Sequence, residues 1–197
     1  MRNLLSTKAQ RQLRLMEILI QNRNWLRLHT LAEQLGCTER ILKNDLNELR
    51  AAFPTIDIQS SVNGIMIDLE VNTSVEDIYQ YFLAHSQSFQ LLEYMFFNEG
   101  LPIYRTVENL HSSNANLYRL GRNITKTLSS QFQIELSFTP TAILGNETDI
   151  RYFFAQYFSE RYYFLDWPFP DLPEEDLTEF ADFFYKITNY PMRFSIY

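Results

Sequence analysis

Two short stretches of the chain concentrate side chains that can hydrogen-bond to nucleic acid. The first contains Arg40, Lys43, Asn44 and Asn47, and the second contains Asn116, Arg119, Arg122, Asn123 and Lys126. Because residues three or four apart share one face of a helix, each stretch would present a polar face rich in donors. Guanidinium, ammonium and amide groups match the donor and acceptor pattern of the DNA major groove. Both stretches are therefore predicted to contact double-stranded DNA, and a merely solvated helix face is the alternative interpretation of each.

The first stretch lies in a pattern that is typical of a helix-turn-helix unit. Recurring leucine and isoleucine residues predict a helix over 8–22, and Thr30 and Glu33 have the capping-box spacing that would begin a second. Gly36 stands where a left-handed residue ends a helix, and Thr38 is placed to cap a third. The last helix of such a unit can lie in the major groove, with its early residues at base edges.

A hairpin is predicted directly after these three helices. Apolar and polar residues alternate over 56–61 and again over 65–69, and Asn63-Gly64 separates the two runs. Asn-Gly between alternating runs is a strong hairpin signal. Three helices and a hairpin make a winged helix, and Asn63 at the tip of the wing would approach a phosphate backbone.

A second unit is predicted at a fixed offset from the first. A shift of 75 positions places Ala32 on Val107, Leu35 on Leu110, Thr38 on Ser113, Leu42 on Leu117 and Leu49 on Ile124. A repeat of this kind indicates a second helix-turn-helix unit that has diverged in sequence. Two helical segments between 73 and 99 precede it, and Thr73 and Glu76 again have capping-box spacing.

The long helix of this second unit is predicted from about Asn114, with Ser113 as its cap. Gly121 inside it costs helix stability and is expected to allow the close approach of another backbone. Strands over 134–138 and 142–144 fall near the place where the first wing would map. The complete set of predicted DNA-contacting residues is Thr38, Arg40, Lys43, Asn44, Asn47, Asn63, Ser113, Asn114, Asn116, Arg119, Arg122, Asn123 and Lys126.

The last third of the chain is aromatic and acidic. Asn146 can cap a helix with an aromatic stripe, which indicates a core or a subunit interface rather than a base-stacking platform, because such platforms need nearby positive charge. Acids over 174–179 precede and line a further helix with an apolar face, and acids there favour the helix dipole. The sequence leaves open whether this last face is core or interface.

The charge of the chain is unevenly distributed. The net charge is -7, but residues 1–55 hold nine Lys and Arg against five Asp and Glu, whereas residues 131–197 hold four against eleven. A basic head and an acidic body are compatible with DNA contact through the head alone. The single cysteine, Cys37, cannot form an internal disulfide, and no run is long enough to cross a membrane. We therefore expect a cytoplasmic protein that has no membrane contact and no metal.

These patterns together predict a mainly α fold with small β-hairpin wings: two winged helix-turn-helix units followed by C-terminal helices. The predicted domains are 1–70 and 71–165 for the two units, with 166–197 as the start of a truncated regulatory region.

With both units in view, the chain resembles the Mga-type virulence regulators of Gram-positive bacteria over roughly residues 5–165. The resemblance rests on LAEQLGCTERILKNDLNEL (31–49), on the second Asn- and Arg-bearing unit, and on YFFAQYF (152–158) after it. It implies two DNA-binding domains, then regulatory domains similar to those controlled by the sugar phosphotransferase system, and a C-terminal oligomerisation part. The chain departs from this pattern by ending at Tyr197, as a fragment, a truncated form or a short relative. Control by histidine phosphorylation is not expected, because His29, His85 and His111 all precede residue 165.

Three functions compete on this evidence. The favoured one is a transcription regulator, expected to be an activator, with a homodimer and contact with RNA polymerase as further expectations. The second is a protein-interaction module on a winged-helix scaffold. An enzyme is disfavoured, because the sequence has no Gly-rich phosphate loop and no nucleophile elbow. The acid pair Asp166 and Asp171 is of a kind that any chain of this composition has, and no cofactor is expected.

Overall fold

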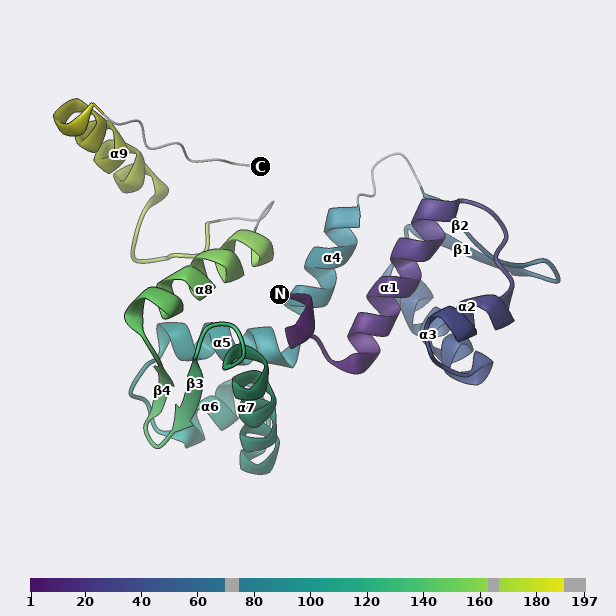
Figure 1. Ribbon diagram of the computed structural model, residues 1–197, viewed down its shortest axis with the longest axis horizontal. Helices are drawn as coiled ribbons and strands as arrows, with labels where there is room; N and C mark the ends of the chain where they lie inside the picture. The colour runs from purple at the N-terminus through teal and green to yellow at the C-terminus, as the bar shows by residue number, and fades with distance from the viewer. Residues whose placement is uncertain (70–74, 163–166, 190–197) are drawn as a thin grey trace.

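The fold is mainly helical and carries two small antiparallel hairpins (Figure 1), which confirms the predicted fold class. The computed structural model describes residues 1–69, 75–162 and 167–189. Thr73 and Asp166 lie outside these ranges, so the structure does not test the cap predicted at the one or the acid pair that includes the other.

The first unit consists of a 3-10 turn, three helices and a hairpin. Its elements are η1 (Arg2–Leu4), α1 (Thr7–Asn22), α2 (Leu28–Gln34), α3 (Glu39–Ala52), β1 (Ile56–Ser61) and β2 (Gly64–Leu69). Leucines at helical spacing on α3 and isoleucines at alternate positions of the hairpin point inward, as Leu42, Leu49, Ile58 and Ile67 show by their burial. The hairpin turns at Val62 and Asn63, so the first wing is confirmed.

The predicted start of the second helix is wrong. The helix α2 begins at Leu28 rather than near Thr30, and Arg27 at its N-cap position makes no side-chain cap. Its entry is fixed instead by backbone pairing with the wing, because Leu26 and Ile65 exchange two N–H···O bonds of 2.8 Å. Gly64 permits this pairing: a β-carbon there would overlap the Leu26 carbonyl, and the φ of Gly64 is +129°. A contact across the unit therefore overrides the local capping signal.

The second unit follows through α4 (Val75–Ala84) and repeats the first. Its elements are α5 (Gln87–Phe97), α6 (Ile103–Asn109), α7 (Asn114–Leu128), β3 (Glu135–Phe138) and β4 (Thr141–Leu144). The starts of α2 and α6 lie 75 positions apart, and so do the starts of α3 and α7. Pro102 stands at the N-cap position of α6. The second wing is confirmed, although its strands are shorter than those of the first.

The turn of the first unit recurs in the second bond for bond. The Cys37 N–H donates to the Ala32 carbonyl at 2.9 Å, and the Ser112 N–H donates to the Val107 carbonyl at 3.1 Å. Gly36 has the predicted positive φ of +62°, whereas the corresponding residue of the second unit is a histidine, His111, with a φ of +45°. The structure therefore confirms the 75-position offset.

Gly121 allows a close approach, but not the one that was predicted. A β-carbon on Gly121 would overlap the ring of Phe138 from the second wing, rather than another backbone. Phe138 is buried and also packs against the ring of Tyr118, with 5.1 Å between the ring centroids. The glycine thus admits an aromatic side chain against the middle of α7.

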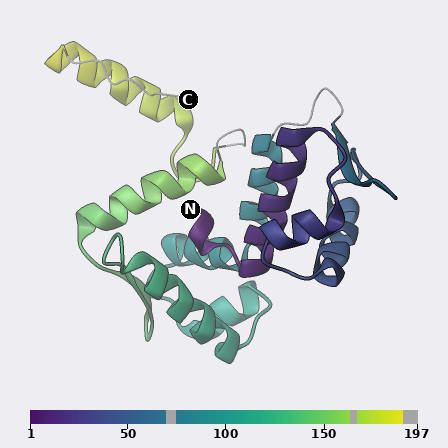
Figure 2. The ribbon, with the colours of Figure 1, turned by 45° about the vertical axis from the view of Figure 1, so that its right-hand side comes forward.

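The two units share one core and are joined by α4 and by the N-terminal segment (Figures 1 and 2). The helix α4 packs against α1 on one side and against α8 (Glu147–Arg161) on the other. The segment 1–5 crosses to the second unit, where η1 contacts α7 and the Met1 amino group lies 3.4 Å from Glu160. The Tyr79 hydroxyl on α4 donates to the same carboxylate at 2.6 Å.

The two C-terminal helices differ in their surroundings. Asn146 caps α8 by accepting from the Thr148 N–H at 2.8 Å, and the aromatic stripe of α8 is buried against α5, where Tyr157 and Phe89 stack at 5.1 Å. The core interpretation of that stripe is therefore confirmed. In contrast, α9 (Glu174–Thr188) has no buried residue and stands away from the other helices in both views.

Candidate nucleic-acid interface

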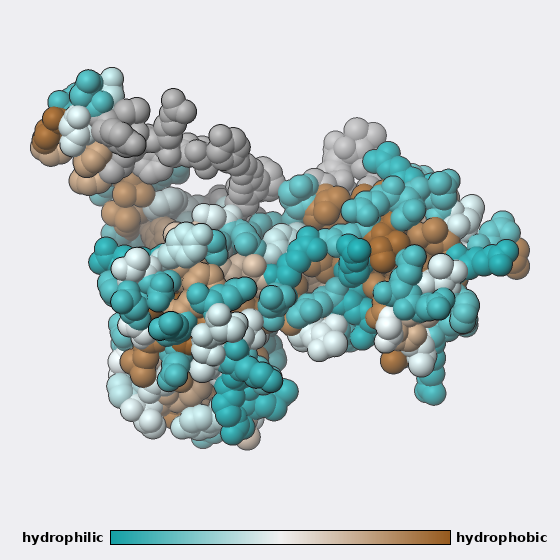
Figure 3. Space-filling model, in the orientation of Figure 1, coloured by the Kyte–Doolittle hydropathy of each residue, from teal (hydrophilic) through white to brown (hydrophobic). Residues whose placement is uncertain are grey.

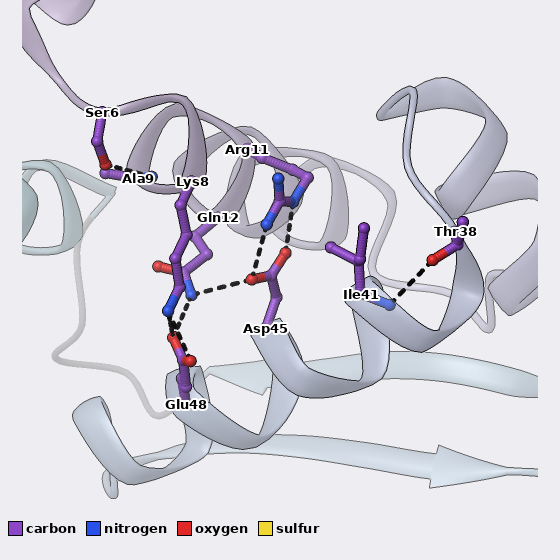
Figure 4. Close-up of polar contacts among 9 residues, drawn as sticks. All are labelled: Ser6, Lys8, Ala9, Arg11, Gln12, Thr38, Ile41, Asp45 and Glu48. Atoms are coloured by element: carbon purple, nitrogen blue, oxygen red, sulfur yellow. Dashed lines mark hydrogen bonds and ion pairs between the residues drawn. The ribbon is translucent and has the colours of Figure 1, made fainter.

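The first polar face lies along α3 and begins at its cap. The Thr38 hydroxyl accepts from the Ile41 N–H at 3.3 Å, as predicted for the N-cap (Figure 4). Four side chains then stand exposed on the solvent side of the helix, at spacings of three and four residues: Arg40, Lys43, Asn44 and Asn47. Nothing in the described part of the chain joins the first three to a carboxylate, so their polar groups are available to a partner.

Two residues of α3 differ from the sequence pattern. The apolar spacing of this helix places Ile41 next to Leu42 on the inward face, yet Ile41 is 39% exposed, beside the cap at the start of the helix. An exposed aliphatic side chain there could meet the methyl group of a thymine. Arg50 lies at the helical spacing that continues the polar face, but it donates to the Ile58 carbonyl at 2.9 Å, to Asn47 at 3.3 Å and to Ser60. Arg50 therefore ties α3 to the wing, and it occupies the amide oxygen of Asn47.

A buried ion pair fixes α3 on α1 (Figure 4). Asp45 is 2% exposed, and Arg11 donates to its carboxylate with Nε at 2.6 Å and with a second nitrogen at 3.1 Å. Gln12 adds a third hydrogen bond of 3.2 Å. The hydrogen bonding to Asp45 raises the pKa of the Arg11 guanidinium. Sequence reasoning missed the pair, although a carboxylate between the buried leucines of α3 is a signal that could have found it.

A second polar tie joins the same two helices closer to solvent. The Lys8 ammonium lies 2.6 Å from the Glu48 carboxylate, and the Gln12 amide donates to it at 2.8 Å. These hydrogen bonds hold the pKa of Glu48 below its ordinary value, with Lys8 as the main cause. The orientation of α3 is thus set by five polar side chains of α1 and α3 as well as by leucine packing.

The second polar face lies along α7. The Ser113 hydroxyl accepts from the Asn116 N–H at 3.2 Å, which confirms the predicted cap. Asn116 itself is half-buried. Its amide donates to Ser112 at 2.9 Å and accepts from Arg119 at 2.7 Å, so it stabilises the turn before α7. The remaining polar residues of the predicted set on this helix are exposed, namely Asn114, Arg119, Arg122, Asn123 and Lys126. Strongly hydrophilic atoms accordingly gather over α7, at the lower centre of Figure 3.

Hollows border the α7 face on both sides. On one side, Arg122 and Lys126 line a groove of about 450 Å³ against the second wing. On the other side, Arg119 and Asn123 line a cleft between the two units. No hydrogen bond or ion pair within the described ranges links the α3 set to the α7 set, so the structure presents two separate polar surfaces.

The wing residue Asn63 is exposed at the hairpin tip. Its backbone N–H donates to the Ser61 hydroxyl at 3.0 Å, which shapes the turn and leaves the side chain toward solvent. Beside it, Val62 is fully exposed.

Other kinds of site receive no support in the part of the chain that the structure describes. Within it, no three His, Cys, Asp or Glu residues are grouped as metal ligands would be. Burial raises the pKa of the half-buried Cys37 thiol, which disfavours a reactive thiolate. No helix in the described ranges has the length and apolar character to span a bilayer.

Comparison with known proteins covers both units and the tail. The model of the M protein trans-acting positive regulator (MGA) helix-turn-helix domain matches residues 6–65, and that of the Mga helix-turn-helix domain matches 71–158. The model of the MGA PRD domain matches 173–197.

Two curated relatives carry related names. A Streptococcus pneumoniae protein named as a trans-acting regulator is 46% identical over 195 residues, which is 99% of this chain and 40% of the relative. The capsule synthesis positive regulator AcpA of Bacillus anthracis is 26% identical over 179 residues, which is 88% of this chain and 36% of AcpA. The chain thus spans less than half the length of each. Since three Mga models match in succession along one chain, and a relative named as a regulator aligns with nearly all of it, the chain belongs to the Mga family of transcription regulators.

Proposed function

We propose that this chain is the DNA-binding part of a transcription regulator and that it holds promoter duplex DNA with both winged helix-turn-helix units. The observation that carries the proposal is the repeated turn. In both units a hydroxyl-capped helix follows the same left-handed turn, and its solvent face presents Arg, Lys and Asn side chains. In helix-turn-helix proteins this helix enters the major groove.

The two helices would play different parts. On α3, Arg40, Lys43 and Asn44 are free to reach base edges or phosphates, and Asn47 has its amide nitrogen left for this. On α7, the residues that would contact DNA are Arg119, Arg122, Asn123 and Lys126. Thr38 would hold the start of α3, and Ser113 and Asn116 would hold the start of α7. Asn114, the first residue of α7, would lie where the helix meets the DNA. Asn63 would meet the backbone from the wing.

The test is binding of the purified chain to labelled promoter-length duplex at two salt concentrations. Each phosphate contact contributes about 0.9 to the slope of log affinity against log salt. R40A/K43A and R122A/K126A should each weaken binding and reduce this slope by up to about 2.

The matched control is R151A/K186A, which removes two cations from α8 and α9, away from both polar faces. Affinity unchanged in R122A/K126A would exclude the second unit as a DNA reader. Absence of wild-type binding at low salt would reject the proposal for this chain.

A protein-interaction module remains the second candidate, and α9 is the observation that favours it. Phe180, Phe183 and Ile187 are 54%, 62% and 67% exposed on a helix that has no buried residue. A DNA-blind chain that forms a stable hetero-complex would favour this candidate.

Further parts of the proposal concern the whole regulator. We place the two DNA-binding domains at 1–70 and 71–165 and the start of a regulatory region at 166–197, and the PRD match at 173–197 supports the last of these. Activation rather than repression is supported by the printed names of the family and of AcpA, both positive regulators. A homodimer is proposed because a positive regulator acts at paired promoter sites. Contact with RNA polymerase is proposed because such a regulator acts at promoters.

A further inference from the structure

The cleft between the two units is a cavity of about 570 Å³ that five helices line, namely α1, α3, α4, α5 and α7. The first turn of α1 borders it from the first unit, the first turn of α5 borders it from the second, and one side of α7 closes it. Residues of the N-terminal segment also line it, including the buried Leu4 and Leu5. The cleft therefore meets both units at once.

The first turns of two helices, α1 and α5, line this cleft. The first N–H groups of a helix have no partner within the helix and carry partial positive charge. Ser6 caps α1 by accepting from the Ala9 N–H at 3.2 Å. Ser86 stands at the N-cap of α5 but makes no side-chain cap there, so the first turn of this 11-residue helix keeps its donors.

Ser88, the second residue of α5, adds a side chain to the backbone donors of this first turn. It is only 8% exposed and lines the cleft, yet its hydroxyl has no hydrogen-bond partner among the residues that the structure describes. The Ser88 hydroxyl is not among the fully enclosed polar atoms of the described residues, so it keeps contact with the open cleft. A ligand that accepts hydrogen bonds within the cleft would give this hydroxyl a partner.

The charge around the cleft favours an anion. Lys8 and Glu48 both line it, but they neutralise each other at 2.6 Å. Arg119 also lines it and donates only to the neutral amide of Asn116, without a carboxylate partner in the described ranges. The amide of Asn123, one turn further along α7, offers another donor on the same side.

We propose that this cleft binds a phosphate group, held by the first turn of α5, the Ser88 hydroxyl, Arg119 and Asn123. The phosphate comes either from the DNA backbone or from a free phosphate or phosphorylated small molecule. The first source rests on the proposed function, and the second does not. These donors all belong to the second unit, and the first turn of α1 from the first unit lines the cleft beside them.

The first experiment is a titration of the whole chain with inorganic phosphate, with sodium chloride at equal ionic strength as the reference. A ligand that binds the folded state raises the unfolding temperature with its concentration. S88A should weaken phosphate binding about tenfold, as the loss of one hydrogen bond to a charged group does, and R119Q should weaken it at least as much. S159A and R151Q are the controls, because both residues are exposed on α8.

The second experiment measures DNA affinity of S88A and S159A at fixed salt, and it separates the two sources. A loss of about tenfold in S88A alone assigns the cleft to a backbone phosphate. Unchanged DNA affinity, together with phosphate stabilisation that S88A abolishes, assigns it to a free phosphate. If phosphate stabilises no more than chloride and S88A binds DNA as wild type does, the phosphate site is rejected. If wild type binds no DNA at all, the titration still decides the site.

Discussion

The two winged units have the same turn, but they hold their long helices by different chemistry. In the first unit, α3 is tied to α1 by the buried Arg11–Asp45 pair and to the wing by Arg50. In the second, the position 75 residues after Asp45 is Leu120, and the wing reaches α7 through the ring of Phe138 over Gly121. The same backbone arrangement can therefore be held by an ion pair or by apolar packing. The ion pair constrains the direction of the contact, whereas apolar packing constrains the volume that the side chains fill.

The largest expected effect comes from breaking the buried ion pair between Arg11 and Asp45. R11A leaves the Asp45 carboxylate buried without its cation, which should lower the free energy of unfolding by about 3–5 kcal/mol. Urea denaturation followed by circular dichroism measures the loss. R11M/D45L, which gives the first unit the apolar chemistry of the second, should recover most of it. A double variant as unstable as R11A would show that the pair does more than compensate its own burial.

The next prediction tests the apolar packing of Phe138 against Gly121. G121A gains about 1 kcal/mol of helix propensity, but it forces the Phe138 ring out of a packed site at a cost of about 1–3 kcal/mol. We expect a net loss of about 1 kcal/mol in the same urea experiment. The partner variant G121A/F138L should relieve the overlap. A stabilised G121A would mean that the ring moves freely and does not set the position of α7.

Removing the glycine from the first turn and introducing one into the second should change the stability of the protein in opposite directions. A residue with a β-carbon costs roughly 1–2 kcal/mol in the left-handed region. G36A should therefore destabilise the protein by about 1 kcal/mol, whereas H111G should stabilise it by less than about 1 kcal/mol, since Gly also loses more chain entropy. Equal effects on both turns would show that His111 has a compensating contact.

The smallest effect concerns pH. Lys8 and Gln12 hold the pKa of Glu48 below its ordinary value, so the stability from this carboxylate is present above the ordinary value of 4.5 and is lost as the pH falls through the lowered pKa. For an exposed pair the expected loss is about 0.2–1 kcal/mol. E48Q should flatten the acid side of the stability profile, below the ordinary value of 4.5, by that amount, compared with E147Q in the exposed pair on α8. An unaltered profile would show that the first unit does not need this tie.

The features that the sequence predicted are those set by neighbours along the chain. The caps at Thr38 and Ser113, the turn at Gly36 and the Asn63-Gly64 hairpin are all local, and the structure confirms them. The start of α2 was missed because a backbone pair with Ile65 decides it. Asp45 was missed because its partner lies 34 positions away.

The candidate site divides along the same line. The exposure of Arg40, Lys43 and Arg122 follows from helical periodicity, which the sequence displays. The engagement of Arg50 with the wing, and of Asn116 with Ser112, depends on where other side chains happen to lie. Which residues share the cleft between the units depends on how α1, α3, α4, α5 and α7 pack together, and no pattern within one helix encodes it.

The position of the N-terminal segment affects the order in which the chain folds during synthesis. A ribosome delivers residues in order, and Met1 contacts Glu160 across 159 positions. The three helices and hairpin of the first unit can assemble as they emerge, but Leu4 and Leu5 must wait for most of the second unit to be translated before they are covered. Contacts that close so long a loop form late, because chain entropy opposes them until the intervening structure exists. Docking of the first five residues is therefore the step that marks completion of the tandem unit.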